Sequence, residues 1–567
     1  MTRAGAAILA AALPPDVTDL ARHTERLVAL IDAVVPTITD VLLVVDRATL
    51  PFVPAVGELL PGATVRAVVI GRTTPDERAA AGPDAVLVTV RNLEGIADRL
   101  RLLPQPQLVI DVARRARAGK VRGVRQVAIT LRPGGLAVVA DVGGRLPPRG
   151  ADLFRDVEVL GTCVAGTKIS QHMFTVRAEQ ADEVLDARYG DAWGRTLVLR
   201  EPRRHEGGGE LVSHGQGPFE SGPLSTDVPE MRLHEYERPC CAARQVMWLE
   251  DHWLPETWRH AHRRRFYHRR LDSRFQGAQS VEVGFELEPP RELPGTYFYL
   301  DTECPGHFGH VTTEVLSRYW GWVEARKLYP DLRALISVRN SVQKVPAFQL
   351  EMFEALGIPT DTMVVIGPHE VVVPQRLLAA TPALENPLSI DPEITQVWER
   401  LAAGLQAAAP LRVSDAAAPA PTVPPAEVGD RIFVSRRAGN KRECLDTPEI
   451  ESFFRRRGFA VVYPEDYAYR DQAAIFAGAR VVAGFAGSAM FSTMFAPHAK
   501  VVLIASDGYR AANEKLVATA NGATIHYFWG TEEPQVREPG APRSDVYSSS
   551  FRFPLKDHRW ALRRALR

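Results

Sequence analysis

Short apolar runs alternate with amphipathic stretches through the first 200 residues of the chain. The runs are rich in valine and leucine and are bounded by Gly, Pro or Asp, a pattern typical of strands buried on both faces of a parallel sheet. They fall at residues 41–45, 65–70, 85–90, 108–112 and 136–140. Helical segments between them predict βαβ units. We therefore expect residues 1–200 to form a Rossmann-like domain.

The next segment, residues 201–285, shows no such period. Glycines cluster at 207–209 and recur between 215 and 222, so an irregular connecting region is predicted. Within it, residues 260–270 have the sequence HAHRRRFYHRR. A charge run of this kind is typical of a solvated helix face. Contact with an anionic acceptor or a membrane surface is the alternative.

Residues 286–408 return to a regular pattern and predict a second α/β unit. A helix is expected over 311–327, because its apolar residues recur on one side. Another is expected over 347–356, where Gly357 tolerates the left-handed cap that ends a helix. Strands are expected at 297–300, 334–338, 363–366 and 371–373.

A Pro/Ala-rich stretch, residues 409–430, cannot form a packed core and is expected to link two lobes. Residues 431–567 then predict a third α/β unit. Its strands are expected at 431–434, 460–463, 481–483 and 501–504, and its helices at 471–479 and 560–567. The last of these, WALRRALR, is basic and amphipathic. The fold class is therefore α/β, with several Rossmann-like units.

Composition narrows the class of protein. The 567 residues suffice for several domains of ordinary globular composition. The 68 basic and 68 acidic side chains cancel, which argues against a general nucleic-acid binder. Five cysteines without a CxxC pair argue against a disulfide framework and favour a reducing compartment. Because no apolar stretch is long enough to span a bilayer, we expect a cytoplasmic location, with peripheral membrane contact left open.

The strongest functional signal is an ordered series of short motifs. In the second α/β unit it comprises Phe308-Gly309-His310, Glu314, Arg318, 348–351 and 356–358. In the third unit it comprises 435–437, Arg442, Phe459, 464–465, Gln472, Phe476, Ala479, 484–489 and 495–497. In this order the motifs resemble glycosyltransferase family 61 over residues 297–530.

The resemblance implies a pair of Rossmann lobes in the GT-B arrangement. Residues 286–408 would be the acceptor lobe, and residues 431–567 the nucleotide-sugar lobe. It further implies an inverting transfer of sugar, expected from a uridine diphosphate-linked donor, to a hydroxyl of a carbohydrate or other acceptor. A role in polysaccharide or glycoconjugate synthesis follows from the same resemblance.

Three arginines, Arg436, Arg437 and Arg442, come just after a predicted strand, where open α/β sheets bind ligands. Guanidinium groups stay charged and bind phosphate through paired hydrogen bonds, so they suit a pyrophosphate leaving group. The alternative is that these arginines form an exposed basic turn and bind no phosphate.

The loop with Gly484, Gly487 and Ser488 lies between a predicted strand and a helix expected near Ala489. Small residues allow close approach, and a helix N-terminus attracts anions. A tight turn needed only for packing is the alternative.

This chain departs from the family pattern in the same region. The family motif often has the form Gly-x-His-Gly-Ala with an Asn further on, whereas this chain has Ala486 at the His place and Ser492 at the Asn place. The identity of the sugar therefore stays open. The resemblance also implies that Glu465 accepts hydrogen bonds from ribose hydroxyls and that Gln472 bonds the donor or the backbone.

An inverting transfer needs a general base that takes the proton of the acceptor hydroxyl. His310 lies at an expected helix start and Glu314 lies one turn later, so the two share a helix face. The carboxylate would orient the imidazole and stabilise its protonated form. The alternative is that His310 only caps the helix N-terminus and that Glu314 is an ordinary charged neighbour. His307 and Asp301 are the further candidate bases.

The tripeptide Asp301-Thr302-Glu303 follows an apolar strand, as in glycosyltransferases that hold a divalent metal on the donor phosphates. Acidic turns after strands are common, and GT-B enzymes generally use arginines and helix ends instead. We therefore predict no metal site, and no cofactor besides the nucleotide-sugar substrate.

The first domain faintly resembles another family. Residues 131–136 (LRPGGL) resemble the turn before a late strand of class I methyltransferases. The glycine-rich cofactor loop of that fold would follow the first strand, but residues 45–50 (VDRATL) contain no glycine. We expect this domain to be degenerate. Two rival functions stay open: an S-adenosylmethionine-dependent methyltransferase, and a non-catalytic glycan-binding or scaffold protein.

Overall fold

A computed structural model of the chain divides into two compact units. The first unit is Met1–Trp193 with Met247–Glu286, and the second is Gly194–Val246 with Leu287–Arg567. The structure describes residues 11, 22–34, 38–79, 81, 86–90, 103–114, 130–140, 142–144, 154–168, 172–263, 266–275, 278–281, 288–339, 344–407, 427–439, 441–533 and 549–567. Most of the predicted linker, residues 409–426 of 409–430, lies outside this set.

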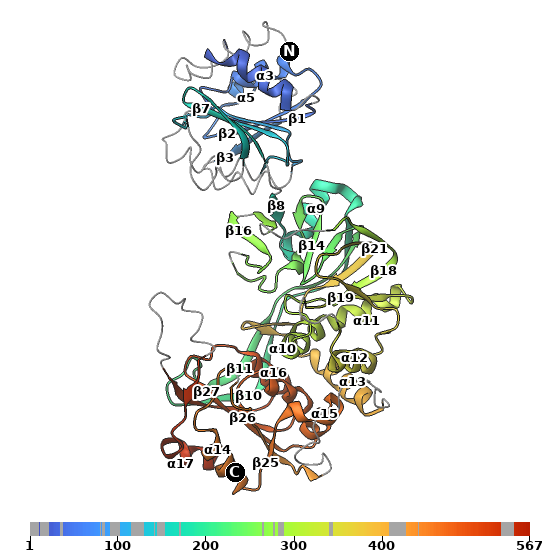
Figure 1. The fold of residues 1–567 in the computed structure, drawn as a ribbon, viewed down its shortest axis with the longest axis vertical. Helices are drawn as coiled ribbons and strands as arrows, with labels where there is room; N and C mark the ends of the chain where they lie inside the picture. The colour runs from blue at the N-terminus through green and yellow to red at the C-terminus, as the bar shows by residue number, and fades with distance from the viewer. Residues whose placement is uncertain are drawn as a thin grey trace. The chain divides into compact units, whose positions relative to one another are not determined.

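In the first unit, the five strands expected from the apolar runs form the parallel part of one sheet (Figure 1). They are β1 (Asp40–Asp46), β2 (Thr64–Ile70), β3 (Val86–Val90), β4 (Leu108–Asp111) and β5 (Leu136–Val139), and all are parallel. With antiparallel β7 (Cys163–Lys168) and β6 (Phe154–Leu160), the order is β3-β2-β1-β4-β5-β7-β6.

Alternate residues of β1 enter two separate hydrophobic clusters. Val41 and Leu43 pack in one cluster, with residues of α3 (Thr24–Val34) and α4 (Phe52–Leu59). Leu42 and Val44 pack in the other. The sheet is therefore buried on both faces, which is the reason that its strands are continuous apolar runs.

The remainder of the first unit contains α9 (Ala181–Tyr189) and short strands. They are β8 (His172–Thr175), β14 (Val246–Leu249), β15 (His252–Trp253), β16 (Leu271–Phe275) and β17 (Ala278–Val281). In the described part of 260–270 the chain forms turns rather than the predicted helix face. Arg177 donates to the carbonyl oxygens of Ala261 and Arg263 and stacks over the Phe266 ring, so this basic cluster is partly tied to the unit.

The second unit contains two lobes. The first lobe has a sheet of β18 (Arg291–Tyr299), β19 (Arg333–Ser337), β20 (Val364–Ile366) and β21 (Val371–Ala380), all parallel. Antiparallel β12 (Met231–Glu237) and β13 (Cys240–Ala242) pair with β21, and β9 (Gly194–Arg200) pairs with β12. The helices of this lobe are α11 (Tyr319–Leu328), α12 (Ala347–Ala355) and α13 (Ile394–Ala407).

The second lobe has parallel strands in the order β25-β24-β26-β27-β28. They are β25 (Ala460–Val462), β24 (Arg431–Val434), β26 (Val481–Phe485), β27 (Lys500–Ser506) and β28 (Ile525–Glu532). Its helices are α14 (Thr447–Arg455), α15 (Tyr469–Ala477), α16 (Asn513–Asn521) and α17 (Leu555–Ala565). All four strands predicted for this lobe are present within two residues at each end, and β28 was not predicted.

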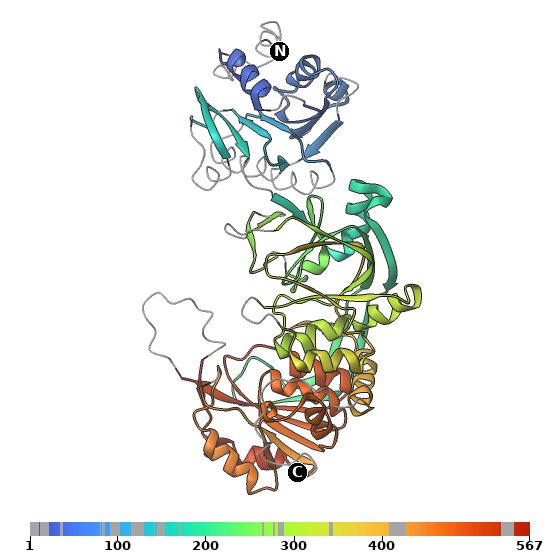
Figure 2. The same ribbon diagram turned by 45° about the vertical axis from the view of Figure 1, so that its right-hand side comes forward.

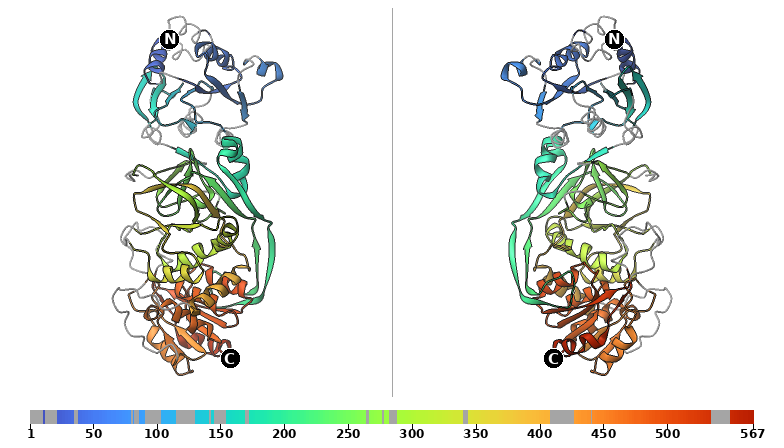
Figure 3. Two further views of the ribbon diagram at one scale, coloured as in Figure 1. Left: turned by 90° about the vertical axis from the view of Figure 1, so that its right-hand side faces the viewer. Right: turned by 90° about the vertical axis from the view of Figure 1, so that its left-hand side faces the viewer.

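The expectation of an irregular region over 201–285 differs from the structure. Residues 203–228 form β10 (Arg203–His214) and β11 (Gly222–Val228), which extend the second lobe's sheet beside β28 (Figure 3). The glycines are needed for packing, since a Cβ on Gly209 would lie 2.2 Å from the carbonyl oxygen of Ala523. The pairing register also shifts between Glu206 and Glu210, as at a β-bulge.

The two lobes share one hydrophobic core, which contains residues of α11, α12 and α13 together with residues of α15 and α16. Figure 2 shows the yellow-green helices of the first lobe against the orange helices of the second. An α/β fold with several parallel sheets was predicted, and the structure confirms it.

The helix predicted over 311–327 is broken into three pieces. A π-helical segment, η4 (Val311–Val315), follows the short α10 (Phe308–His310), and a 3-10 turn, η5 (Leu316–Arg318), precedes α11. The Thr312 and Thr313 hydroxyls donate to the carbonyl oxygens of Phe308 and Gly309. Such side-chain bonds compete with regular helix bonding.

Candidate functional site

His310 and Glu314 form the hydrogen-bonded pair that the sequence predicts. The Nδ1 atom of His310 lies 2.7 Å from Oε1 of Glu314. The second oxygen of Glu314 accepts a hydrogen bond from the hydroxyl of Thr302. The side chains of His310 and Glu314 are 18% and 13% exposed, so the pair is screened from bulk water but accessible. The π-helical segment carries Glu314, and such segments are frequent at functional sites.

Asp301 organises the first-lobe side of the site rather than facing a substrate. Its buried carboxylate accepts from the amides of Gln245, Thr302 and Ser337 and from the Ser337 hydroxyl. Burial, partly opposed by these hydrogen bonds, raises the pKa of Asp301. Because Thr302 in turn donates to Glu314, the acidic tripeptide supports the His310–Glu314 pair. Within the described ranges, no group of three His, Cys, Asp or Glu residues could hold a metal ion.

His307 lies next to His310 and is the other histidine of this segment. The two ring centroids are 4.8 Å apart, in an edge-to-face arrangement. The two rings are therefore neighbours beside α10. His307 remains the second candidate for the base.

Arg436 joins two loops of the second lobe. Its guanidinium donates to the carbonyl oxygens of Lys441 and Arg442, and also to the carbonyl oxygen of Ala486, at 2.9 Å. The loop after β24 is thereby fastened to the loop after β26. Both loops follow the carboxyl ends of parallel strands, the edge at which open α/β sheets bind ligands.

Gly487 lies where two of the predicted arginines meet. A Cβ atom there would lie 2.6 Å from Nη2 of Arg436 and 3.5 Å from Nη2 of Arg442. The residue has a φ of +145°, which side chains rarely adopt. The structure therefore brings the backbone of Gly487 against Arg436 and Arg442, which belong to a different loop of the lobe.

Sequence reasoning missed Glu514, which lies beneath this loop at the start of α16. The amide of Gly487 donates to its Oε1 at 2.7 Å, and the Tyr509 hydroxyl donates to the same oxygen at 2.8 Å. Burial raises the pKa of Glu514 to about 7. The guanidinium of Arg442 lies 5.4 Å from the centroid of the Tyr509 ring, so the arginine and the buried carboxyl share a neighbour.

The amide of Gly487 is therefore already hydrogen-bonded within the protein, to Glu514. The predicted α-helix near Ala489 is a 3-10 helix, η8 (Ser488–Phe495), with Gly487 as its N-cap. Gly484 has a packing role, since a Cβ there would lie 2.6 Å from the carbonyl oxygen of Val434.

Arg437 lies to one side of the loop and is bound by carboxylates. Its Nη2 atom donates to both oxygens of Asp466, at 2.7 and 2.8 Å, and Nε is 3.5 Å from Glu465. Glu465 itself is about half exposed. The amide of Gln472 donates to the carbonyl oxygens of Pro464 and Tyr467, so this side chain shapes the turn that carries Glu465.

The two halves of the site meet at Gly309 and Ser488. A Cβ on Gly309 would lie 2.9 Å from the Cβ of Ser488 and 3.1 Å from the Phe491 ring. Beside them, Phe308 of the first lobe packs edge-to-face on Tyr469 of the second, with ring centroids 5.7 Å apart. The segment with His310 therefore touches the loop beside Arg436 and Arg442.

The two departures from the family pattern are both buried. Ala486 offers its carbonyl oxygen to Arg436. Ser492 is fully buried, and its hydroxyl has no hydrogen-bond partner among the described residues.

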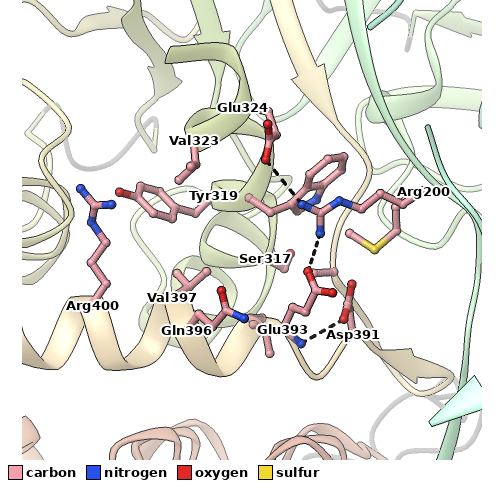
Figure 4. Close-up of a pocket in the computed structure, with 14 residues that line it drawn as sticks. Arg200, Ser317, Tyr319, Val323, Glu324, Asp391, Glu393, Gln396, Val397 and Arg400 are labelled. Carbon is pink, nitrogen blue, oxygen red and sulfur yellow. Dashed lines mark hydrogen bonds and ion pairs between the residues drawn. The ribbon is translucent and has the colours of Figure 1, made fainter. Parts of the chain in front are cut away.

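A cavity of about 320 Å³ lies elsewhere in the first lobe, between α11 and α13 (Figure 4). Arg200 bridges Glu324 and Glu393 there and stacks over Trp320. None of the sequence-predicted site residues lines this cavity. We assign this cavity no role in the chemistry.

In the first unit, the loop that would hold a methyl-donor cofactor is closed by its own contacts. Asp46, at the end of β1, accepts from the amides of Ala48, Thr49 and Arg114. Arg114 follows β4, so the bond spans the point between β1 and β4 where the strand order reverses. That point is where ligands bind in open α/β sheets.

Residues 308–503 match the family model described as Glycosyltransferase 61. This match confirms, over these residues, the family resemblance predicted from the motifs. It covers the His310–Glu314 pair and the loops of Arg436, Arg442 and Gly487. No curated protein matches the chain.

Among solved structures, the MycE methyltransferase from the mycinamycin biosynthetic pathway is 12% identical, with a TM-score of 0.21, over 28% of this chain and 54% of that chain. An S-adenosyl-L-methionine methyl transferase from Silicibacter pomeroyi DSS-3 is 14% identical, with a TM-score of 0.21, over 30% and 99%. Human N-acetylserotonin methyltransferase is 13% identical, with a TM-score of 0.18, over 27% and 54%. This chain thus spans about half the length of the first of them. Similarity at this level carries no inference about activity.

Proposed function

We propose that the second unit is an inverting glycosyltransferase that moves a sugar from a nucleotide-sugar, expected to be linked to uridine diphosphate, to a hydroxyl acceptor. The observation that carries the proposal is the contact of Gly309 with Ser488, which brings the segment of His310 against the loop of Gly487. A candidate base and a candidate phosphate site thereby lie on facing lobes, as a two-substrate transfer requires. A role in polysaccharide or glycoconjugate synthesis is part of the proposal.

The donor diphosphate would lie beside Gly487, against Arg442 and Arg436. Fixed positive charge at that place stabilises the negative charge that develops on the leaving diphosphate. Arg436 also holds the two loops in position, so its contribution is partly structural. Arg437 is engaged by Asp466, and we assign it to supporting Glu465, which would accept from the ribose hydroxyls.

The base would be His310. When Nδ1 carries the ring proton and donates it to Glu314, Nε2 is the unprotonated nitrogen that takes the acceptor's proton. When Nε2 takes that proton, the imidazolium that forms is stabilised by the Glu314 carboxylate. Thr302 and Asp301 keep Glu314 in place through the hydrogen bonds described above.

The acceptor oxygen forms a bond to the anomeric carbon of the sugar while the bond from that carbon to the diphosphate oxygen breaks. The diphosphate leaves with the electron pair of that bond, and the acceptor's proton moves to His310. Because attack and departure occur on opposite faces, the anomeric configuration inverts.

The test is release of nucleoside diphosphate from a panel of nucleotide-sugars by the full chain, with and without sugar acceptors and with divalent metal removed by a chelator. Release with one donor, increased by an acceptor, is the expected result. If no donor is turned over or hydrolysed, the proposal fails, and the non-catalytic scaffold becomes the better account. The variant Gly487→Ala, in which the added Cβ would lie 2.6 Å from Nη2 of Arg436, should release less nucleoside diphosphate than the wild type.

A further inference from the structure

A basic surface of the second lobe lies on α17 and the end of α14. We name it the α17 basic surface. It consists of Arg456, Arg457, Arg559, Arg563, Arg564 and Arg567, with the side chain of Trp560 among them. Whereas the whole chain has a net charge of zero, residues 554–567 carry five basic side chains and one acidic. The charge is thus concentrated locally.

The cations of the two helices lie close together. α14 and α17 pack into the same hydrophobic cluster, through Phe453 and Phe454 on one side and Leu562 on the other. Partial burial, and then the charges of Arg563, Arg559 and Arg456, lower the pKa of Arg457. Among the described residues no carboxylate forms an ion pair with any of the six arginines.

The apolar side of α17 packs against the second lobe. Leu555, Leu562 and Ala565 are buried in the core of the second lobe. The outward side therefore presents the arginines and Trp560, whose indole is the most exposed of the large hydrophobic side chains of the described residues, at 72%. The guanidinium of Arg564 lies over the Trp560 ring, 5.8 Å from its centroid.

This surface lies at the sheet edge opposite the proposed donor site. Arg431, the first residue of β24, donates to the carbonyl oxygen of Leu566, which fixes the end of α17 beside the amino-terminal ends of the strands. Gly487 and Arg442 lie beyond the carboxyl ends of β26 and β24. The basic surface is therefore not needed to bind the donor diphosphate.

We infer that the α17 basic surface binds an anionic lipid bilayer peripherally, with the arginines on lipid phosphates and Trp560 in the headgroup region. Arginine side chains near an anionic leaflet are attracted by its surface potential, and tryptophan prefers the membrane–water interface. Charge complementarity and the exposed indole together select this occupant. The inference does not depend on the proposed transfer reaction.

The experiment is co-sedimentation of the full chain with vesicles of phosphatidylcholine alone and of phosphatidylcholine mixed with phosphatidylglycerol. Binding should favour the anionic vesicles and fall as salt is added, because salt screens exposed charges. The double variant Arg559→Glu/Arg563→Glu should lower the partition coefficient by about tenfold or more. Trp560→Ser should lower it about threefold without changing the salt dependence.

The matched control is Arg238→Glu/Lys327→Glu, which changes the net charge equally at two exposed positions of the first lobe. It should bind as the wild type does, and every variant should keep its thermal unfolding midpoint. If Arg559→Glu/Arg563→Glu does not fold, Arg563→Gln alone and the salt dependence of the wild type supply the same test. Equal binding to both vesicle types, unchanged binding by the arginine variants, or binding only to RNA or an anionic polysaccharide would overturn the inference.

Discussion

The backbone amide of Gly487 donates a 2.7 Å hydrogen bond to Oε1 of Glu514, a carboxyl buried beneath the loop. This bond holds Gly487 at a φ of +145° and keeps its backbone beside Arg436 and Arg442. The shape of the proposed phosphate site thus depends on a residue 27 positions further along the chain.

Replacing Glu514 with Gln should change the pH dependence of stability. The pKa of Glu514 is about 7 in the fold, above its ordinary value of 4.5. Between these values the folded state binds a proton that the unfolded state lacks, so the glutamate's contribution is largest below the unfolded pKa and is lost as pH rises through about 7. Glutamine cannot ionise, so its contribution to stability does not fall over this pH range.

The expected result is that the stability of Glu514→Gln relative to wild type increases between about pH 5 and about pH 8, by at most ~3 kcal/mol. Thermal unfolding midpoints of the two proteins at both pH values measure this. A difference that stays the same at both pH values would show that Glu514 does not titrate in this range.

Gly487→Ala should weaken donor binding strongly. The added Cβ would lie 2.6 Å from Nη2 of Arg436, and alanine rarely adopts this φ, so the loop and the arginine must both shift. A loss of affinity of about tenfold or more is expected for the nucleoside diphosphate. Gly478→Ala is the matched control, since its Cβ would meet only ordinary contacts at 3.5 Å and beyond. Equal affinities of both variants and wild type would remove Gly487 from the site.

His310→Ala should lower kcat by about a hundredfold or more, with little change in donor affinity, since a base acts on the acceptor's proton. Glu314→Gln should lower kcat less, on the order of tenfold, because the amide can hold the imidazole in the wrong tautomer. Steady-state kinetics with the best donor and acceptor measure both. A large loss in His307→Ala with none in His310→Ala would transfer the role to the neighbouring ring.

The first unit should not bind S-adenosylmethionine. The loop after β1 is closed by Asp46, whose carboxylate accepts from the amides of Ala48, Thr49 and Arg114. A ligand that binds only the folded state raises the unfolding temperature. No shift is expected in a thermal unfolding scan with S-adenosylmethionine, and a concentration-dependent rise would revive the methyltransferase alternative.

The sheets were predictable because their strands are buried on both faces and appear as apolar runs. The same reasoning failed for β10 and β11, where glycines that accommodate the backbone near Ala523 resemble loop residues. It also missed the π-helical segment, because the bonds of Thr312 and Thr313 to the preceding turn leave no trace in apolar spacing.

The pair His310 and Glu314 was predictable because the two residues are four positions apart in a continuous helical stretch, α10 followed by η4. Glu514 was not, because its link to Gly487 arises only from the tertiary fold. Among the described residues, no helix has the length and hydropathy of a membrane-spanning segment.

The most direct test of the account is calorimetric titration of the full chain with a panel of nucleoside diphosphates, uridine diphosphate among them, in the presence of a chelator. We predict that one of them binds, and that Arg442→Gln weakens it by about tenfold or more, since charged hydrogen bonds to phosphate are lost. Arg480→Gln, an exposed arginine paired with Asp430, should bind as wild type does. Absence of binding, or equal binding by Arg442→Gln and wild type, would contradict the account.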